Sequence, residues 1–206
     1  MAYSSFSFDA LRNQFGLRQV VEPWLPDPLE AVAVPALDEH YRQLLGFPLT
    51  TEKARSEVLV MPVLLHVWRH FAHGLTLFSG ERIDSEPDSG LVGECDFVFC
   101  ARPRLMWVEA PVACVIEAKR EDLEVGLRQC SAQLLGLQRF NARASLAIDP
   151  LVGCTTDGNR WQFVRLRQGR YLEIDPRLVY LSELPYLVGL WKALLQPFVE
   201  LALTDD

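Results

Sequence analysis

The spacing of apolar residues changes character along this chain and divides it into helical and strand-like stretches. Apolar residues separated by steps of four and three, the period of an α-helix, recur at Leu123, Leu127, Cys130, Leu134 and Leu137. We therefore expect a helix from about Leu123 to Asn141. A second helix, apolar on most sides in its first half, is expected from about Glu57 to Ala72, with Ser56 as its N-cap.

Strand-like runs occupy the stretches beside these helices. Residues that favour strands are concentrated at Leu75–Phe78, Leu91–Cys100, Val112–Lys119, Leu151–Thr155, Trp161–Leu166 and Tyr171–Ile174. Thr156-Asp-Gly-Asn separates the fourth run from the fifth, and an Asp-Gly pair in this position predicts a hairpin. Residues 1–55 are expected to form short helices broken by proline-containing turns.

The order of these elements predicts an α/β fold in which helices flank a central mixed β-sheet. We expect one domain over residues 1–206, built from a helical N-terminal extension (1–55), an α-β-β-β-α-β core (56–175) and a C-terminal helix (176–206). The C-terminal helix is apolar enough either to belong to the core or to form the interface of a homodimer, and its sequence favours neither.

Composition narrows the class of protein. Half of the residues are hydrophobic and 23% are charged, as in soluble globular proteins. The most hydrophobic stretch, Leu184 to Leu203, is interrupted by Lys192, Pro197 and Glu200, so we expect no membrane span. The N-terminus lacks the basic-then-apolar order of a signal peptide, and a cytoplasmic location is the expectation.

The cysteines point to the same compartment. The chain has five of them, an odd number, and no CxxC pair. Neither a disulfide framework nor a zinc ribbon is therefore expected. We predict buried free thiols, as is usual in a reducing cytosol.

Ionisable residues that could bind a metal or take part in catalysis lie on two of the predicted strands. Side chains alternate faces along a strand, so Glu94 and Asp96 share one face, as do Glu117 and Lys119. If the strands are neighbours, three carboxylates and one ammonium converge, and such a cluster needs a cation. Hard oxygen ligands suit Mg²⁺ or Mn²⁺, held by Asp96 and Glu117 with the Ala118 carbonyl as a third ligand. The apolar residues beside them, Cys95, Ile116 and Ala118, are expected on the opposite face of the strands, which faces the core.

Glu94-Cys-Asp96, then Ile116-Glu-Ala-Lys119, then the helix that starts Asp122-Leu-Glu-Val-Gly resemble the PD-(D/E)xK nuclease superfamily. The similarity is greatest to the N-terminal nuclease domain of type I restriction motor subunits and to small stand-alone relatives, and it spans roughly residues 56–166. It implies a restriction endonuclease-like core. Cys95 stands where the superfamily has its eponymous proline, and this departure removes no catalytic group.

The resemblance also implies roles for individual residues. Asp96 and Glu117 match the two acidic residues and Lys119 matches the lysine, which orients the attacking water or stabilises charge at phosphorus. Glu57 matches an acidic residue on the preceding helix that contacts the metal through water. A glutamine on the following helix matches Gln129 or Gln133, which lie about one helical turn apart; we favour Gln129.

The expected function is therefore metal-dependent hydrolysis of phosphodiester bonds in DNA, in restriction, repair or defence, with RNA as the alternative substrate. A net charge of −7 opposes tight, non-specific binding to a polyanion. The rival interpretation is a catalytically silent, nuclease-like scaffold that binds or regulates. No helicase or recognition domain accompanies the candidate core, and a third option is a subunit that a partner protein recruits to nucleic acid.

Three further features have competing interpretations. His66, His70 and His73 have metal-ligand spacing, but we favour ordinary residues of a helix end. Trp161 is expected in the hairpin core rather than as a platform for base stacking. A phosphate-binding rim and ordinary solvated charge are equally supported for a set of arginines: Arg102, Arg104, Arg120, Arg128, Arg139 and Arg143.

Overall fold

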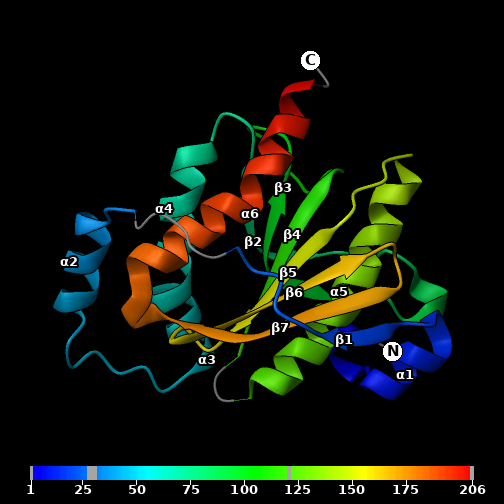
Figure 1. Ribbon diagram of the computed structural model, residues 1–206, viewed down its shortest axis with the longest axis horizontal. Helices are drawn as coiled ribbons and strands as arrows, with labels where there is room; N and C mark the ends of the chain where they lie inside the picture. The colour runs from blue at the N-terminus through cyan, green and yellow to red at the C-terminus, as the bar shows by residue number, and fades with distance from the viewer. Residues whose placement is uncertain (1, 27–31, 120–121, 205–206) are drawn as a thin grey trace.

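A seven-stranded mixed sheet forms the middle layer of the computed structural model, which describes residues 2–26, 32–119 and 122–204 (Figure 1). Its strands are β1 (Arg18–Val21), β2 (Thr76–Arg82), β3 (Glu94–Cys100), β4 (Val112–Ala118), β5 (Leu151–Thr156), β6 (Arg160–Arg167) and β7 (Tyr171–Tyr180). They lie in the spatial order β1-β7-β6-β5-β4-β3-β2. The pairs β1/β7 and β4/β5 are parallel, and the other pairs of neighbours are antiparallel. The predicted α/β class with a mixed sheet is confirmed.

Helices cover both faces of this sheet (Figure 1). One side carries α2, α4 and α6, and the other carries α1 and α5. The bounds are α1 (Phe8–Phe15), α2 (Pro35–Gln43), α3 (Glu52–Arg55), α4 (Met61–Phe71), α5 (Leu123–Arg143) and α6 (Leu184–Thr204). The expected order of helix, three strands, helix and strand is found from α4 to β5. None of the described helices is both long and apolar enough to cross a membrane.

Two hydrophobic cores result, one on each face of the sheet. In the first, the ring of Trp161 meets that of Trp191 on α6 edge to face, with 6.2 Å between ring centroids. Trp161 is fully buried, which confirms it as a core residue. Because Leu187, Val188 and Trp191 are buried in the same cluster, α6 belongs to the core. All five cysteines are buried and free, as expected.

The helix that precedes β2 differs from its prediction at both its start and its interior. It begins at Glu52 rather than Glu57, because the Thr51 hydroxyl caps it by accepting from the Ala54 N–H at 3.0 Å. Ser56 is therefore inside the helix and does not cap it. Residues Ser56–Val60 widen into a π-helical segment before α4 starts.

Pro62 explains this widening, since it has no N–H to donate to the Val58 carbonyl four residues earlier. Side chains of α2 contact the carbonyls of the π segment instead. Tyr41 Oη donates to the Leu59 carbonyl at 2.7 Å, and His40 Nε2 lies 3.3 Å from the Val58 carbonyl oxygen. The π segment is thus held by α2, and single-turn insertions of this kind are frequent at functional sites.

Other boundaries also move. Residues 1–55 are not wholly helical, because Arg18–Val21 forms the edge strand β1 beside β7. Strand β7 continues to Tyr180, so α6 starts at Leu184 and not near residue 176. Strand β3 starts at Glu94 instead of Leu91, which pairs separately with Glu86 in an isolated bridge. The 156–159 hairpin between β5 and β6 is confirmed.

Glycines let α5 lie close to the sheet, and this closeness positions the site described below. Asp122 caps the helix by accepting from the Glu124 and Val125 N–H groups. A Cβ on Gly126 would come within 2.0 Å of Thr155 Oγ1, and one on Gly136 within 2.3 Å of Tyr3 Oη. Only glycine permits these approaches, so Gly126 fixes how α5 seats on β5, and Gly136 lets the helix pack against Tyr3 of the N-terminal segment.

Candidate active site

Asp96 and Glu117 meet because β3 and β4 are antiparallel neighbours, with Phe97 opposite Ile116. Asp96 lies near the start of β3, and Glu117 near the end of β4. Asp96 Oδ2 accepts from the Ala118 N–H at 2.7 Å, which ties this carboxylate to the backbone of the neighbouring strand. The two acidic residues therefore share one corner of the sheet, as strand alternation predicts.

Glu117 is the centre of a buried polar cluster. Its side chain is 1% exposed, and Lys119 Nζ lies 2.6 Å from its Oε1. Gln133 Nε2 donates to Glu117 Oε2 at 2.7 Å and lies 3.2 Å from the Glu94 carbonyl oxygen. Gln133 thus bridges α5 to both strands, and it holds Glu117 on the side away from the lysine.

The electrostatics of the cluster favour a cation. Burial raises the pKa of Glu117 to about 8, and nearby Asp96 adds to this, while Lys119 and Gln133 oppose it. Burial also raises the pKa of Asp96, against the Ala118 hydrogen bond and Lys119. Burial would lower the pKa of Lys119, but Glu117, Glu52 and Asp96 together raise it above its ordinary value. Two carboxylates thus share one ammonium in a partly desolvated corner.

A cleft of about 520 Å³ opens onto this corner. Its lining residues come from the 52–60 helix, from β2 and from the corner where β3 and β4 bring Asp96 and Glu117 together: Glu52, Lys53, Ser56, Glu57, Ser79, Gly80, Glu94, Asp96 and Ala118. Across the cleft, Glu52 Oε1 lies 3.6 Å from Lys119 Nζ. The cleft is therefore predominantly acidic, with Asp96 on its wall, and Lys119 contacts the lining residue Glu52.

Glu57 lines the cleft but lies further from the cluster than Glu52 does. Its side chain is 63% exposed and pairs with Lys53 at 3.7 Å. Glu52, which sequence reasoning missed, is the acidic residue of this helix that contacts Lys119. The missed signal was Thr51, an N-cap residue type placed directly before Glu52.

The glutamine contact is made by Gln133, and the preference for Gln129 is corrected in this respect. Gln133 is fully buried against Glu117, whereas Gln129 is partly buried. The expectation for Cys95 is also corrected. Ile116 and Ala118 face the α4/α6 core as expected, but Cys95 packs in the α5 core, because the sheet is buried on both faces.

The sequence supports a phosphate-binding rim and ordinary solvated charge equally for six arginines, and none of the five that the structure describes lines the cleft. Arg102 and Arg104 follow the end of β3, at the opposite end of that strand from Asp96. Arg143 lies at the far end of α5 from Leu123, with Nη2 3.3 Å from the Asp84 carbonyl oxygen and its guanidinium over the Phe140 ring. Arg139 lies six residues beyond Gln133, roughly 9 Å along the helix axis. Arg128, near the start of α5, pairs with Glu124 at 3.9 Å, and Arg120 lies outside the described residues.

His66 and His70 lie on α4 and His73 follows its end, and the three are not grouped as a metal site. His66 is partly buried and His70 and His73 are exposed, and burial lowers the pKa of His66 and His70. Within residues 2–26, 32–119 and 122–204, no group of three or more His, Cys, Asp or Glu side chains is arranged as a ready cation cage. A cation at the Asp96–Glu117 corner would thus rely on a carbonyl or water as well as carboxylates.

The donor chemistry of that corner fits Mg²⁺ or Mn²⁺. Two carboxylates and the Ala118 carbonyl are hard oxygen donors, and Mg²⁺ commonly takes one or two carboxylates and keeps several waters. The raised pKa of Glu117, caused by burial and Asp96, is the signature of negative charge that a divalent cation would relieve.

Comparison of the sequence with protein-family models finds no match, and comparison with curated proteins finds no significantly similar sequence.

Proposed function

We propose that this chain is a divalent-metal-dependent nuclease of the PD-(D/E)xK type that hydrolyses phosphodiester bonds in DNA. One observation carries the proposal: Asp96 lines an open cleft, and directly behind it the 1%-exposed Glu117 pairs with Lys119, whose Nζ also lies 3.6 Å from the cleft residue Glu52. Buried, perturbed ionisable groups beside a cleft are typical of active sites. The resemblance of Asp96, Glu117 and Lys119 to the superfamily supports the same assignment.

Asp96, Glu117 and the Ala118 carbonyl would hold Mg²⁺ or Mn²⁺. Bound there, the cation would acidify a water molecule and polarise the scissile phosphodiester. Gln133 and the Ala118 N–H keep the two carboxylates in place through the hydrogen bonds described above. Preorganised charge of this kind needs no rearrangement when the substrate arrives.

Lys119 would act on the substrate side of the site. Its side chain is 18% exposed, and its ammonium contacts both the buried Glu117 and Glu52, which lines the cleft. A compact charge here would orient the attacking water and offset negative charge on the phosphate oxygens. Glu52 and Glu57, on the opposite wall, would orient further waters at the site.

The test is cleavage of supercoiled plasmid, linear duplex, single-stranded DNA and RNA with Mg²⁺ or Mn²⁺. Lys119→Ala should lower the rate at least about 100-fold. Lys192→Ala, on α6 at the other face of the sheet, removes the same charge and should leave the rate unchanged. Equal rates for wild type and Lys119→Ala would reject the proposal, and cleavage of RNA alone would reassign the substrate.

A nuclease-like scaffold without turnover is the second candidate. The acidic cleft favours it, because Glu52, Glu57 and Glu94 present negative charge where a phosphate backbone would lie. No cleavage of any substrate with any divalent metal, together with tight binding to a protein partner, would establish this alternative.

A further inference from the structure

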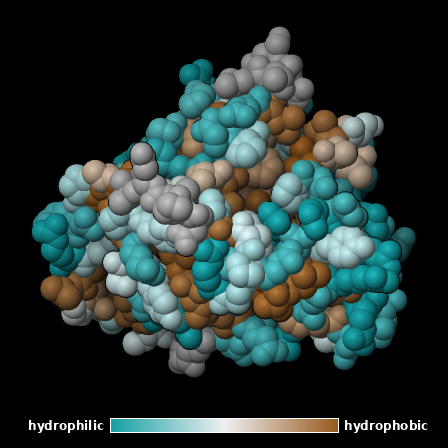
Figure 2. Space-filling model, in the orientation of Figure 1, coloured by the Kyte–Doolittle hydropathy of each residue, from teal (hydrophilic) through white to brown (hydrophobic). Residues whose placement is uncertain are grey.

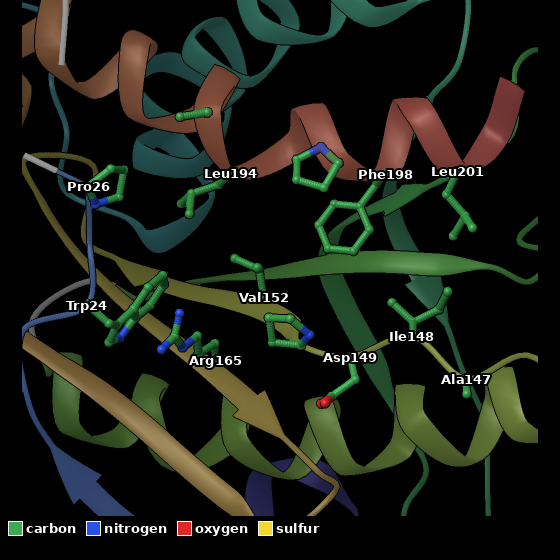
Figure 3. Close-up of a pocket in the computed structure, with 13 residues that line it drawn as sticks. Trp24, Pro26, Ala147, Ile148, Asp149, Val152, Arg165, Leu194, Phe198 and Leu201 are labelled. Carbon is green, nitrogen blue, oxygen red and sulfur yellow. The ribbon is translucent and has the colours of Figure 1, made fainter.

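A second, apolar pocket lies far from the acidic cleft, on the α6 side of the sheet (Figure 3). Its volume is about 440 Å³, within the range of small-molecule sites. Figure 3 shows Phe198 and Leu201 of α6 facing Val152 and Ile148 across it. In Figure 2 the same region is a hydrophobic hollow on the surface of the molecule.

One end of the pocket is polar. Figure 3 shows Arg165 and Trp24 side by side there, and the guanidinium lies over the indole ring at 4.7 Å from its centroid. Arg165 Nε contacts Glu173 Oε2 at 2.5 Å, while Arg167 Nε lies 2.6 Å from Oε1 of the same carboxylate. Two guanidiniums thus share one buried carboxylate. Of the two, Arg165 lines the pocket, as does Asp149, whose Oδ1 accepts from the Gln168 N–H at 2.7 Å.

Trp24 offers a hydrogen-bond donor at the same end of the pocket. Its indole N–H is buried and, among the described residues, has no hydrogen-bond partner. Buried N–H groups are rarely left in this state, so each one calls for an explanation. Trp24 lines the pocket, and because its N–H is buried, a ligand acceptor would reach it only if the indole ring turned.

The wall holding these groups is rigidly anchored. Both oxygens of the fully buried Asp175 are engaged, and its Oδ2 accepts from the backbone N–H of Trp24 at 2.7 Å and of Leu25 at 2.8 Å. The backbone segment that carries Trp24 is therefore fixed against β7, so the main chain at the polar end of the pocket is preorganised. Preorganisation reduces the entropic cost of binding a ligand.

We propose that this pocket binds a small amphipathic carboxylate, with its apolar body between α6 and the β5 side and its carboxylate at Arg165 and Trp24. The apolar walls favour an aliphatic or aromatic body. Arg165 supplies a guanidinium to the pocket lining, and a planar carboxylate matches a guanidinium. This site is independent of the proposed nuclease chemistry, which uses the other face and another end of the sheet.

The experiment is calorimetric titration of the full chain with decanoate and with decanol, both below their aggregation concentrations. Decanoate should bind at least ten-fold more tightly than decanol. Arg165→Gln should remove that preference, whereas Arg165→Lys should retain it. Equal affinity for the two probes in wild type would overturn the assignment of an anionic head.

A pair of variants on α6 tests the location without disturbing the ion pairs. Ala193→Trp places a large ring in the pocket and should weaken decanoate binding at least ten-fold. Gln196→Trp, exposed on the same helix and outside the lining, should bind decanoate as wild type does. Unchanged binding in Ala193→Trp would overturn the proposal. So would a wild-type dimer that Ala193→Trp dissociates and that takes up no decanoate, because the hollow would then be a self-interface.

Discussion

Lys119 Nζ lies 2.6 Å from Oε1 of Glu117, a carboxylate that is almost completely buried. This pair is separated by one residue on β4 and its extension, and it lies where α5 covers the end of the strand. Because the lysine is partly exposed, its ammonium can move aside when a metal ion binds the buried carboxylate. Two fully buried partners of an ion pair could not separate without leaving a buried charge unpaired.

Lys119→Ala should affect both catalysis and folding. Removing the ammonium leaves Glu117 buried without its cation, so the free energy of unfolding should fall by about 1–3 kcal/mol in metal-free protein. Saturating Mn²⁺ should recover part of this loss, because the metal replaces the missing charge. Chemical denaturation with and without Mn²⁺ measures both effects. A loss that metal leaves unaltered would show that Lys119 does not share a site with a cation.

Gln133 and Gln129 provide a matched pair. Gln133→Ala removes the donor to Glu117 Oε2 and should cost about 1–3 kcal/mol of stability, together with a large part of any cleavage activity. Gln129→Ala, one turn away on the same helix, should change stability by less than about 0.5 kcal/mol. Urea denaturation of the two variants checks the difference. Equal losses would mean that the Glu117 contact is not the stabilising one.

Metal binding should be visible as thermal stabilisation. At about 100 times its dissociation constant, Mn²⁺ should add about 2.7 kcal/mol, which is several degrees in melting temperature for a chain of this size. Asp96→Asn should abolish this shift. Glu94→Gln, which neutralises an exposed acid on the same cleft, should retain most of it. A shift that survives Asp96→Asn would place the cation elsewhere.

Gly126 positions α5 against β5, and the stability lost on substituting it should be partly recovered by a second substitution at Thr155. Gly126→Ala would place Cβ 2.0 Å from Thr155 Oγ1 and 2.9 Å from Lys119 Cγ, so α5 or Lys119 must shift. We expect a loss of about 1–3 kcal/mol and reduced metal affinity. Adding Thr155→Ala removes the closest clash, and the double variant should be more stable than Gly126→Ala alone. Strictly additive losses in this double-mutant cycle would contradict the contact.

Asp175 should make stability depend on acid pH. Burial alone would raise its pKa, but hydrogen bonds from Arg177 and from the backbone of Leu25 and Trp24 lower the pKa to about 2. A carboxyl with a lowered folded-state pKa stabilises the protein above its ordinary pKa of 3.8, and that contribution disappears as pH falls towards about 2. The free energy of unfolding of Asp175→Asn should therefore be about 2 kcal/mol below that of the wild type at pH 7. Near pH 2 the two proteins should have nearly the same stability. Denaturation across this range checks it; a difference independent of pH would contradict it.

Several elements follow from local physical chemistry and were predictable. The four-and-three spacing in residues 123–137 specifies a helix whatever surrounds it, and β5 and β6 join through the Asp-Gly hairpin. Strand alternation likewise places Asp96 and Glu117 at one corner once β3 and β4 pair, since the period of two is a property of the backbone.

Tertiary structure decided which groups complete that corner. Gln129 and Gln133 are equivalent in helical spacing, and the choice between them depends on how α5 is rotated and seated, which Gly126 and Gly136 set through contacts with Thr155 and Tyr3. Glu52 reaches Lys119 across the cleft because the helix starts at Thr51 and widens before Pro62. The sequence by itself determined the repeating local patterns, because these depend on neighbours along the chain. Contacts between α5, the 52–60 helix and β4 depend on distant packing, and only the folded chain establishes them.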